Sequence, residues 1–285
     1  MPELPEVQTV VNDLSETITG DQITGFWTNL KKSITLKIGE AKLNSKDLVK
    51  IVTGLEIVKV ERIGKYIVLT MTKGFSLLLH LRMTGKLIVE NKKNQTQLQQ
   101  NKHVHNIFFL KKNGALTFDD VRKFGTIDLI NTSERENFKG IAKLGADPFS
   151  KKFTLEYLAK NISQKKKSIL KEFLLNQEII SGIGNIYASE ILFDAKIDPN
   201  RKAGSLSKKE TFFLHASIKK ILHKAIQMRG TSISDYRDAS GKKGSFQTVL
   251  NVYKRNGQPC KKCATIILKT IHGQRSTFYC PKCQK

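Results

Sequence analysis

The chain has 285 residues, 39% of them hydrophobic, so it can bury a sizeable core and is more typical of two domains than of one. Its 49 lysine and arginine residues against 25 aspartate and glutamate residues give a net charge of +24, spread along the whole length. Membrane-spanning helices are excluded because no apolar stretch approaches the roughly 20 residues that cross a bilayer. The acidic start MPELPE is the opposite of a basic signal peptide, which predicts a cytoplasmic protein.

The positive charge indicates a polyanionic partner. A strongly basic surface binds DNA or RNA by displacing condensed counterions, so binding should weaken steeply with salt. Charge alone also fits a ribosomal, membrane-surface or polyphosphate-binding protein. An AT-rich genome is an alternative source of a lysine-rich composition, in which case part of the charge carries no information about partners. The motifs must therefore decide.

The N-terminal half predicts one helix followed by strands. Directly after the first six residues, apolar side chains recur at helical spacing from Val7 to Ile18. Between residues 33 and 130 the pattern changes to short apolar or alternating runs without helical crossovers, which favours an antiparallel sandwich or barrel. The eight runs are SITLKI, LEIVKV, KYIVLTM, FSLLLHL, KLIVE, VHNIFFL, ALTF and TIDLI. The polar run at residues 91–102 predicts a long hairpin loop.

The C-terminal half predicts helices. The alternating pattern ends between residues 131 and 150, where LGADPF indicates a linker. Ser207 and Glu210 form the pattern of a capping box at the start of the last helix. The helical segments are residues 154–161, 166–176, 185–195 and 207–228.

All four cysteines lie near the C-terminus, as two Cys-X-X-Cys pairs separated by 16 residues. This spacing is typical of one structural zinc ion, held tetrahedrally by four thiolates from two tight turns. Four sulfurs leave no open coordination position, which argues against catalytic zinc; a redox role for the two pairs is the alternative. The zinc ligands predicted are Cys260, Cys263, Cys280 and Cys283.

The segment ISGIGNIYASEILF, residues 180–193, places two glycines around Ile183 just before a helical pattern. Glycines allow close approach of a backbone, and the free N–H groups of a helix start form a phosphate site. Asn185 either caps this helix or contacts a phosphate oxygen, and spacing favours the cap.

Taken together, these motifs closely resemble the bacterial formamidopyrimidine-DNA glycosylases, which repair 8-oxoguanine. The resemblance runs from end to end through MPELPEV, IGKYIV, HLRMTG, DDVRKFG, LGADP, ISGIGNIYASEILF and CPKCQK. It implies an α+β protein with an N-terminal antiparallel β-sandwich and flanking helix, then a helix-two-turns-helix domain that ends in a β-hairpin zinc finger. The expected division is a catalytic domain at residues 1–135, a linker at 136–152, a helical domain at 153–240 and the zinc finger at 241–285.

The resemblance also implies the chemistry. Pro2, once Met1 is removed, presents a secondary amine that attacks the sugar C1′, expels the damaged base and leaves an iminium that permits strand cleavage by β,δ-elimination. Glu3 is expected to protonate the deoxyribose ring oxygen, which requires a carboxyl that keeps its proton. Glu6 either assists proton transfer or stabilises the helix N-terminus. Lys65 is expected to hold a phosphate beside the lesion, although a lone lysine in a hairpin is usually a solvated charge.

Further residues match the positions with which the family holds DNA. Met83, Arg122 and Phe124 are expected to fill the gap left by the extruded base, although Met and Phe are more often core residues. Asn185 and Arg275 are expected to pinch the backbone around the flipped nucleotide. Residues 230–246 correspond to the loop that closes over 8-oxoguanine.

The partner expected is double-stranded DNA with oxidised purines or abasic sites, bound by a monomer without a membrane role. Two alternatives remain. Endonuclease VIII proteins share the catalytic apparatus but excise oxidised pyrimidines; they typically have Gly where this chain has Leu4. The other alternative is a damaged-DNA-binding protein without turnover, against which the joint presence of Pro2, Glu3 and Lys65 argues.

Overall fold

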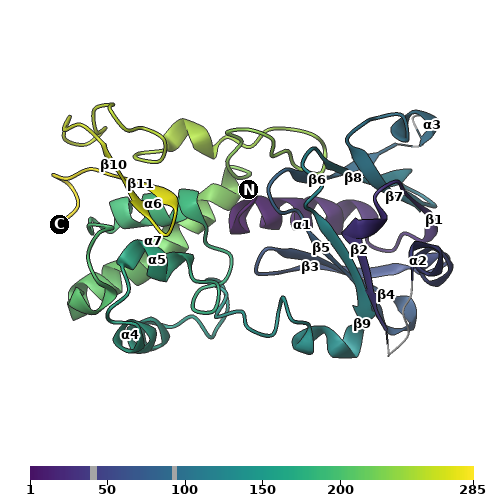
Figure 1. The fold of residues 1–285 in the computed structure, drawn as a ribbon, viewed down its shortest axis with the longest axis horizontal. Coiled ribbons are helices and arrows are strands. Elements are labelled where there is room, and N and C mark those ends of the chain that lie inside the picture. Colours follow the sequence, from purple (N-terminus) through teal and green to yellow (C-terminus); the bar gives the residue numbers. More distant parts are fainter. Residues whose placement is uncertain (39–43, 92–94) are drawn as a thin grey trace. The chain divides into compact units, whose positions relative to one another are not determined.

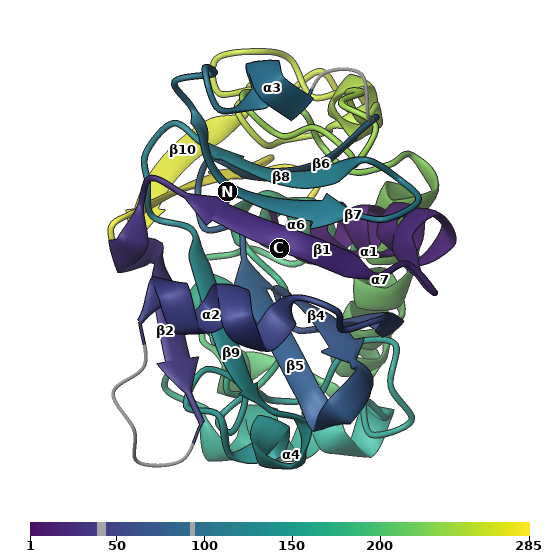
Figure 2. The ribbon, with the colours of Figure 1, turned by 90° about the vertical axis from the view of Figure 1, so that its right-hand side faces the viewer.

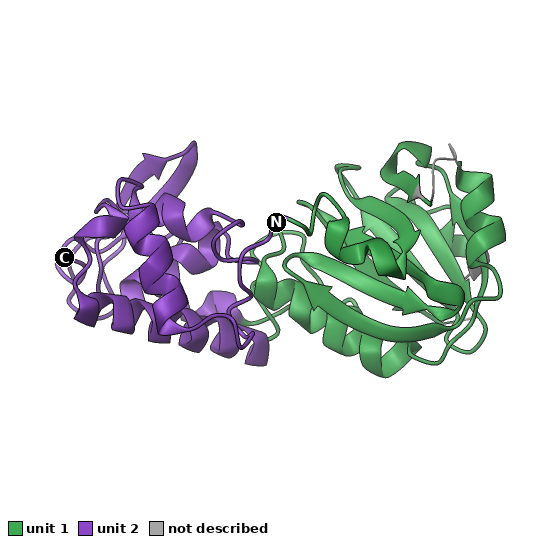
Figure 3. Ribbon diagram, turned by 90° about the horizontal axis from the view of Figure 1, so that it is seen from below, with its two compact units in different colours: residues 1–142, 229–245 green, residues 143–228, 246–285 purple. Residues whose placement is uncertain are grey.

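The computed structural model describes residues 1–38, 44–91 and 95–285. These residues form two compact units (Figure 3). Unit 1 contains residues 1–142 and 229–245, and unit 2 contains residues 143–228 and 246–285. None of the described helices has the length and apolar character needed to cross a membrane.

Unit 1 is built around two β-sheets whose strands run in clearly different directions (Figures 1 and 2). The four-stranded sheet has the order β1 (Ile23–Thr28), β7 (Val104–Leu110), β8 (Ala115–Asp120) and β6 (Gly85–Glu90). The five-stranded sheet has the order β2 (Ile34–Lys37), β9 (Thr126–Asn131), β5 (Phe75–His80), β4 (Tyr66–Met71) and β3 (Ile57–Ile63). One apolar core joins residues of both sheets with those of helix α1 (Leu4–Ile18). The β-sandwich with a flanking helix is therefore confirmed.

The central strands of the five-stranded sheet are buried on both faces. In β5, Leu77 and Leu79 enter the main core, whereas Leu78 packs on the opposite face against Phe138 and Ile141. A strand covered on both sides needs apolar residues at consecutive positions, which explains the uninterrupted run FSLLLHL.

All eight predicted strands are present, but several features of unit 1 differ from the expectation. Strand β1 was not predicted, because Gly25 and a register irregularity interrupt its alternation. Helix α2 (Ser45–Val52) was also missed; it is short and buries only Leu48 and Val52. One pair, β2 with β9, is parallel.

The predicted hairpin at residues 91–102 is wrong. The strands on either side of it, β6 and β7, both pair with β8 and not with each other. The connection instead contains the one-turn helix α3 (Gln95–Leu98), and residues 92–94 lie outside the described part of the chain.

Unit 2 confirms the predicted helices with small shifts of their ends, and a short hairpin follows them (Figure 1). Its elements are α4 (Leu155–Gln164), α5 (Leu170–Leu175), α6 (Asn185–Asp194), α7 (Lys208–Gln227), β10 (Leu268–His272) and β11 (Arg275–Tyr279). The buried Glu190 of α6 accepts hydrogen bonds from the backbone N–H groups of Asn251, Val252 and Tyr253. This carboxylate attaches the segment that leads to the cysteines.

The compact units differ in two ways from the expected division. Residues 229–245 belong to unit 1, whereas the sequence assigned 230–240 to the helical domain and 241–245 to the zinc finger. The zinc finger is not a separate unit, because its core includes Phe193 of α6. The crossing from unit 1 to unit 2 at residues 142/143 lies inside the interval predicted as a linker.

The capping box predicted for α7 is present, and it makes the free energy of unfolding depend on pH. Ser207 and Glu210 cap each other, and Arg201 pairs with the Glu210 carboxylate. The hydrogen bond from Arg201 lowers the pKa of Glu210 from 4.5 to about 2. Burial acts in the opposite direction, and the hydrogen bonds from Ser207 add to the lowering. A carboxyl whose pKa is depressed by folding stabilises the protein above its unfolded pKa and loses that contribution as pH falls toward the folded pKa.

We expect Glu210→Gln to flatten the loss of unfolding free energy between pH 5 and pH 2.5, since glutamine keeps a capping partner but does not titrate. Denaturant unfolding followed by circular dichroism across this pH range measures the effect. Glu16→Gln, at an exposed position on α1, is the control and should follow the wild type. Parallel curves for Glu210→Gln and wild type would contradict the assignment.

Candidate active site

The first turn of α1 holds three of the predicted catalytic residues. Pro2 is buried, whereas Met1 before it is 44% exposed. Glu3 and Glu6 form a reciprocal capping box: the Glu3 side chain accepts from the Glu6 N–H, and the Glu3 N–H donates to Glu6 Oε2 over 2.8 Å. The two glutamates are 3% and 1% exposed. The backbone that carries Pro2 is therefore fixed by two hydrogen bonds in a desolvated environment.

Glu6 also attaches the segment 229–245 to this turn. Its Oε1 accepts a 2.7 Å hydrogen bond from Thr231 N, so both carboxylate oxygens have backbone partners. Gly230 precedes this contact with φ +77°, and a Cβ there would lie 2.8 Å from Glu6 Oε1. Burial and the nearby Glu6 charge raise the pKa of Tyr236, whose side chain packs into the same core. This geometry favours an anchoring role for Glu6 over proton transfer.

Lys65 lies in the two-residue turn between β3 and β4 and is only 9% exposed. Arg62 links this turn to α1, since its Nη1 donates to Gly64 O over 2.9 Å and its Nε donates to Gln8 Oε1 over 2.8 Å. Burial, followed by the positive charges of Arg82 and Lys65, lowers the pKa of the neighbouring His80 to about 3. His80 is thus neutral at physiological pH, and the cationic groups here are lysine and arginine.

The structure brings Met83, Arg122 and Phe124 together at the surface. Arg122 Nη1 lies 3.0 Å from the Met83 sulfur, and its guanidinium stands over the Phe124 ring, 5.0 Å from the centroid. Met83 is 42% exposed and Phe124 is 52% exposed. Large apolar side chains grouped on a surface mark a binding site, and the cation between them suits a mixed apolar and polar ligand. Met83 and Phe124 are therefore not core residues.

A buried carboxylate that the sequence did not single out supports this cluster. Asp120 is 3% exposed and accepts hydrogen bonds from the Thr84 hydroxyl and the Arg122 N–H at one oxygen, and from Gly125 N at the other. It thereby joins the turn that carries Met83 to the turn that carries Arg122. Gly125 is required, because a Cβ would lie 2.4 Å from the ring of Phe118.

In unit 2, Asn185 does not cap α6. Gly184 occupies the N-cap, and the Asn185 side chain donates through Nδ2 to Ser276 O on β11 over 2.9 Å. Among the residues that the structure describes, Asn185 Oδ1 is buried without a hydrogen-bond partner. This bond places the start of α6 beside Ser276, which directly follows the exposed Arg275 in β11. Asn185 can contact a phosphate through the second hydrogen of Nδ2, because an amide NH2 group carries two donors, or through its backbone N–H.

The four cysteines converge as predicted. Their ligand atoms all lie within 4.8 Å of one another, and three of the Sγ–Sγ distances are 3.4, 3.5 and 3.9 Å. Thiolates bound tetrahedrally to zinc at about 2.3 Å are roughly 3.8 Å apart, so the cluster fits one structural Zn²⁺. Burial and the neighbouring sulfurs raise the pKa of Cys283 to about 12, whereas hydrogen bonds from Thr265 lower that of Cys263 to about 6. A divalent cation is what allows all four to gather as thiolates.

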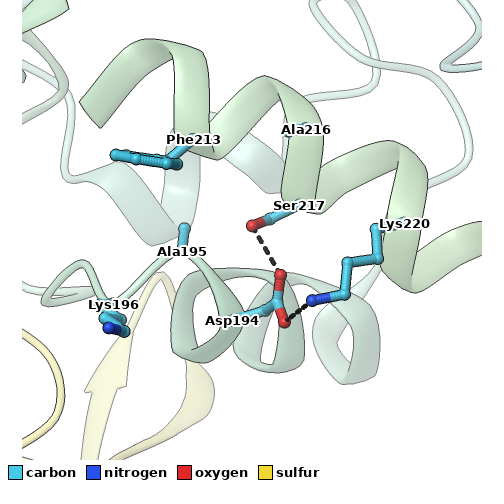
Figure 4. A pocket seen from close by; sticks show the side chains of 7 residues that line it. All are labelled: Asp194, Ala195, Lys196, Phe213, Ala216, Ser217 and Lys220. Atoms are coloured by element: carbon cyan, nitrogen blue, oxygen red, sulfur yellow. Dashed lines mark hydrogen bonds and ion pairs between the residues drawn. The ribbon is translucent and has the colours of Figure 1, made fainter. Parts of the chain in front are cut away.

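A pocket of about 330 Å³ on unit 2 contains none of the predicted site residues (Figure 4). Its one carboxylate, Asp194, accepts hydrogen bonds from the Ser217 hydroxyl and from Lys220 Nζ. These contacts join the end of α6 to α7. The pocket is a helix junction and carries no reactive arrangement of groups.

Family models match most of the chain. The N-terminal domain of formamidopyrimidine-DNA glycosylase matches residues 1–127, its H2TH domain matches residues 144–237, and the zinc finger found in FPG and IleRS matches residues 257–285. The formamidopyrimidine-DNA glycosylase of Pelotomaculum thermopropionicum is 39% identical over 286 residues, covering 100% of this chain and 99% of the relative. The chain belongs to the formamidopyrimidine-DNA glycosylase family. It is a DNA glycosylase of base excision repair, with the abasic-site lyase activity typical of that family.

Crystal structures of other formamidopyrimidine-DNA glycosylases share this fold over the whole length. A Lactococcus lactis Fpg variant in complex with Fapy-dG-containing DNA has a TM-score of 0.89 and 34% identity, with 100% of both chains covered. Wild-type Lactococcus lactis Fpg in complex with oxidised-pyrimidine-containing DNA has a TM-score of 0.87 and 33% identity, again with 100% of both chains covered. These two complexes contain different lesion classes, so the fold alone does not decide between purine and pyrimidine lesions.

The cysteine cluster predicts one zinc per chain and a loss of DNA binding without it. Cys280→Ser should remove the metal, because three sulfurs bind zinc much more weakly than four, and should unfold the β10–β11 hairpin. Elemental analysis and fluorescence anisotropy with a lesion duplex measure both effects. Thr270→Ser on β10 is the control and should retain the ion. A Cys280→Ser protein that keeps stoichiometric zinc would refute the assignment.

Proposed function

We propose that this glycosylase removes oxidised purines, namely 8-oxoguanine and formamidopyrimidines, from double-stranded DNA and then cleaves the strand at the resulting abasic site. The observation that carries the proposal is the buried, reciprocally capped turn of Pro2, Glu3 and Glu6 at the start of α1. The relative bound to Fapy-dG-containing DNA supports the lesion class. The protein acts as a monomer on chromosomal DNA in the cytoplasm.

The reaction begins when the amine of Pro2, exposed by removal of Met1, attacks C1′ of the damaged nucleotide. Glu3 protonates the ring oxygen, the base departs and an iminium joins Pro2 to C1′. The iminium acidifies the C2′ proton, so β-elimination breaks the bond to the 3′ phosphate and δ-elimination then breaks the bond to the 5′ phosphate. The product is a one-nucleoside gap with a phosphate on each side. A secondary amine forms the iminium cation directly, which links excision to strand cleavage.

Other side chains hold the substrate in this scheme. Lys65 binds a phosphate beside the lesion, where its buried ammonium stabilises charge during the reaction. Met83 and Phe124 fill the stack that the base leaves, and Arg122 donates to the unpaired cytosine. In unit 2, Asn185 and Arg275 contact the backbone of the flipped nucleotide. Residues 230–246 cover the base.

Paired duplexes test the lesion class. We expect the protein to nick a duplex with 8-oxoguanine opposite cytosine about tenfold or more faster than one with thymine glycol, because a site built to hydrogen-bond a purine leaves its polar groups unpaired against a pyrimidine. Single-turnover gel assays measure both rates. Faster nicking of thymine glycol favours the endonuclease VIII alternative, and tight binding without nicking of either duplex favours the binding protein without turnover.

Lys65→Ala should slow excision of 8-oxoguanine by about 10²-fold, the order expected on removing one charge-stabilising group. Cleavage of a preformed abasic site should fall much less, since no base has to leave. The ratio of the two rates is the measurement, and Lys50→Ala, at an exposed position on α2, is the matched control. An equal fall of both activities would count against this role for Lys65.

A further inference from the structure

A single arginine fastens the base of the segment 229–245. Arg229 donates from Nε and Nη2 to Asp238 Oδ2 over 2.9 and 2.6 Å, and Nη2 also lies 2.6 Å from Asp13 Oδ2 on α1. Asp238 is fully buried. The planar guanidinium can serve two carboxylates from one fixed geometry, which a lysine ammonium cannot reproduce.

The backbone at this point is unusual for a residue with a side chain. Arg229 has φ +58° and is followed by Gly230 with φ +77°, directly where the chain leaves unit 2 for unit 1. A left-handed conformation outside glycine persists when surrounding contacts over-determine it. The carboxylates of Asp13 and Asp238 supply such contacts.

The same two carboxylates organise the rest of the segment. Asp238 Oδ1 accepts from the N–H groups of Ser240 and Lys242, so it closes the turn at the far end of the segment. Ala239 donates to Asp13 Oδ2 over 3.3 Å and accepts from Val89 N over 3.0 Å, which attaches this turn to α1 and β6. Between these attachments, Ile233 and Ser234 remain exposed.

Helix α1 is therefore the common reference for the catalytic turn and for this segment. Near the helix start, Glu6 holds Thr231, and two turns further along Asp13 holds Arg229 and Ala239. A shift of the segment relative to α1 changes the position of a covered base relative to Pro2. Misplacement of a reacting group by about 1 Å can slow a reaction by about 10²-fold.

We propose that Arg229 is a positioning residue for lesion recognition: by clamping Asp13 and Asp238, it fixes residues 230–245 over the base that Pro2 excises. The proposal rests on the proposed function of that segment and of Pro2. It assigns Arg229 no contact with DNA.

Two variants separate the side chain from the backbone. Arg229→Ala removes the clamp and keeps a side chain at φ +58°, whereas Arg229→Gly removes the clamp and suits that conformation. We expect both to lower kcat/KM for excision of 8-oxoguanine by about 10-fold to 100-fold and to leave cleavage of a preformed abasic site near the wild-type rate, because no base is then covered. Arg229→Lys should recover part of the loss. Arg135→Ala, which removes another surface ion-pairing arginine of unit 1, should match the wild type.

Hydrogen–deuterium exchange of the DNA-free protein tests the Arg229 contacts independently of enzyme activity. Both variants should exchange faster across residues 230–245, at amides such as those of Thr231, Ala239 and Lys242. Wild-type exchange or wild-type excision in Arg229→Gly would overturn the inference. A wild-type protein that neither excises 8-oxoguanine nor cleaves abasic DNA would instead refute the proposed function, and the exchange data would still show whether the clamp exists.

Discussion

The structure of unit 1 depends on how two buried carboxyl groups are satisfied at the start of α1. Burying a polar group is costly unless hydrogen bonds replace its water, and the free N–H groups at a helix start offer that replacement. Glu3 and Glu6 use each other's backbone, and Glu6 also takes the N–H of Thr231. The conformation of the first six residues is thus determined by the folded core, so the nitrogen of Pro2 lies in a defined place.

The same principle recurs at the surface cluster. Met83, Arg122 and Phe124 are exposed, yet the turns that carry them are joined through the buried Asp120 and the hydroxyl of Thr84. The buried hydrogen bonds of Asp120 and Thr84 hold these turns in place, so the apolar side chains stay exposed and do not collapse into the core. These exposed side chains therefore lie on loops whose backbone is fixed by buried hydrogen bonds.

The sequence predicted what local patterns and ordered motifs can carry: eight strands, the main helices, the capping box of α7 and the cysteine cluster. It failed where contacts between distant residues decide. Strand β1 was missed because Gly25 interrupts its alternating pattern. The length of the loop between β6 and β7 does not indicate that β6 pairs with β8. Asn185 forms a hydrogen bond with a residue of β11 and does not cap α6. The partners of Asp120 and Arg229 likewise arise only when segments far apart in the sequence meet.

The central claim is that the nitrogen of Pro2 becomes covalently bound to the sugar of the lesion. The most direct measurement is borohydride reduction of the protein with an 8-oxoguanine duplex, followed by digestion and mass spectrometry of the cross-linked peptide, on a preparation whose processed N-terminus has been verified. The account predicts one adduct, located on the peptide that begins with Pro2. An adduct on a lysine peptide such as that of Lys65, or no adduct from a correctly processed protein, would contradict it.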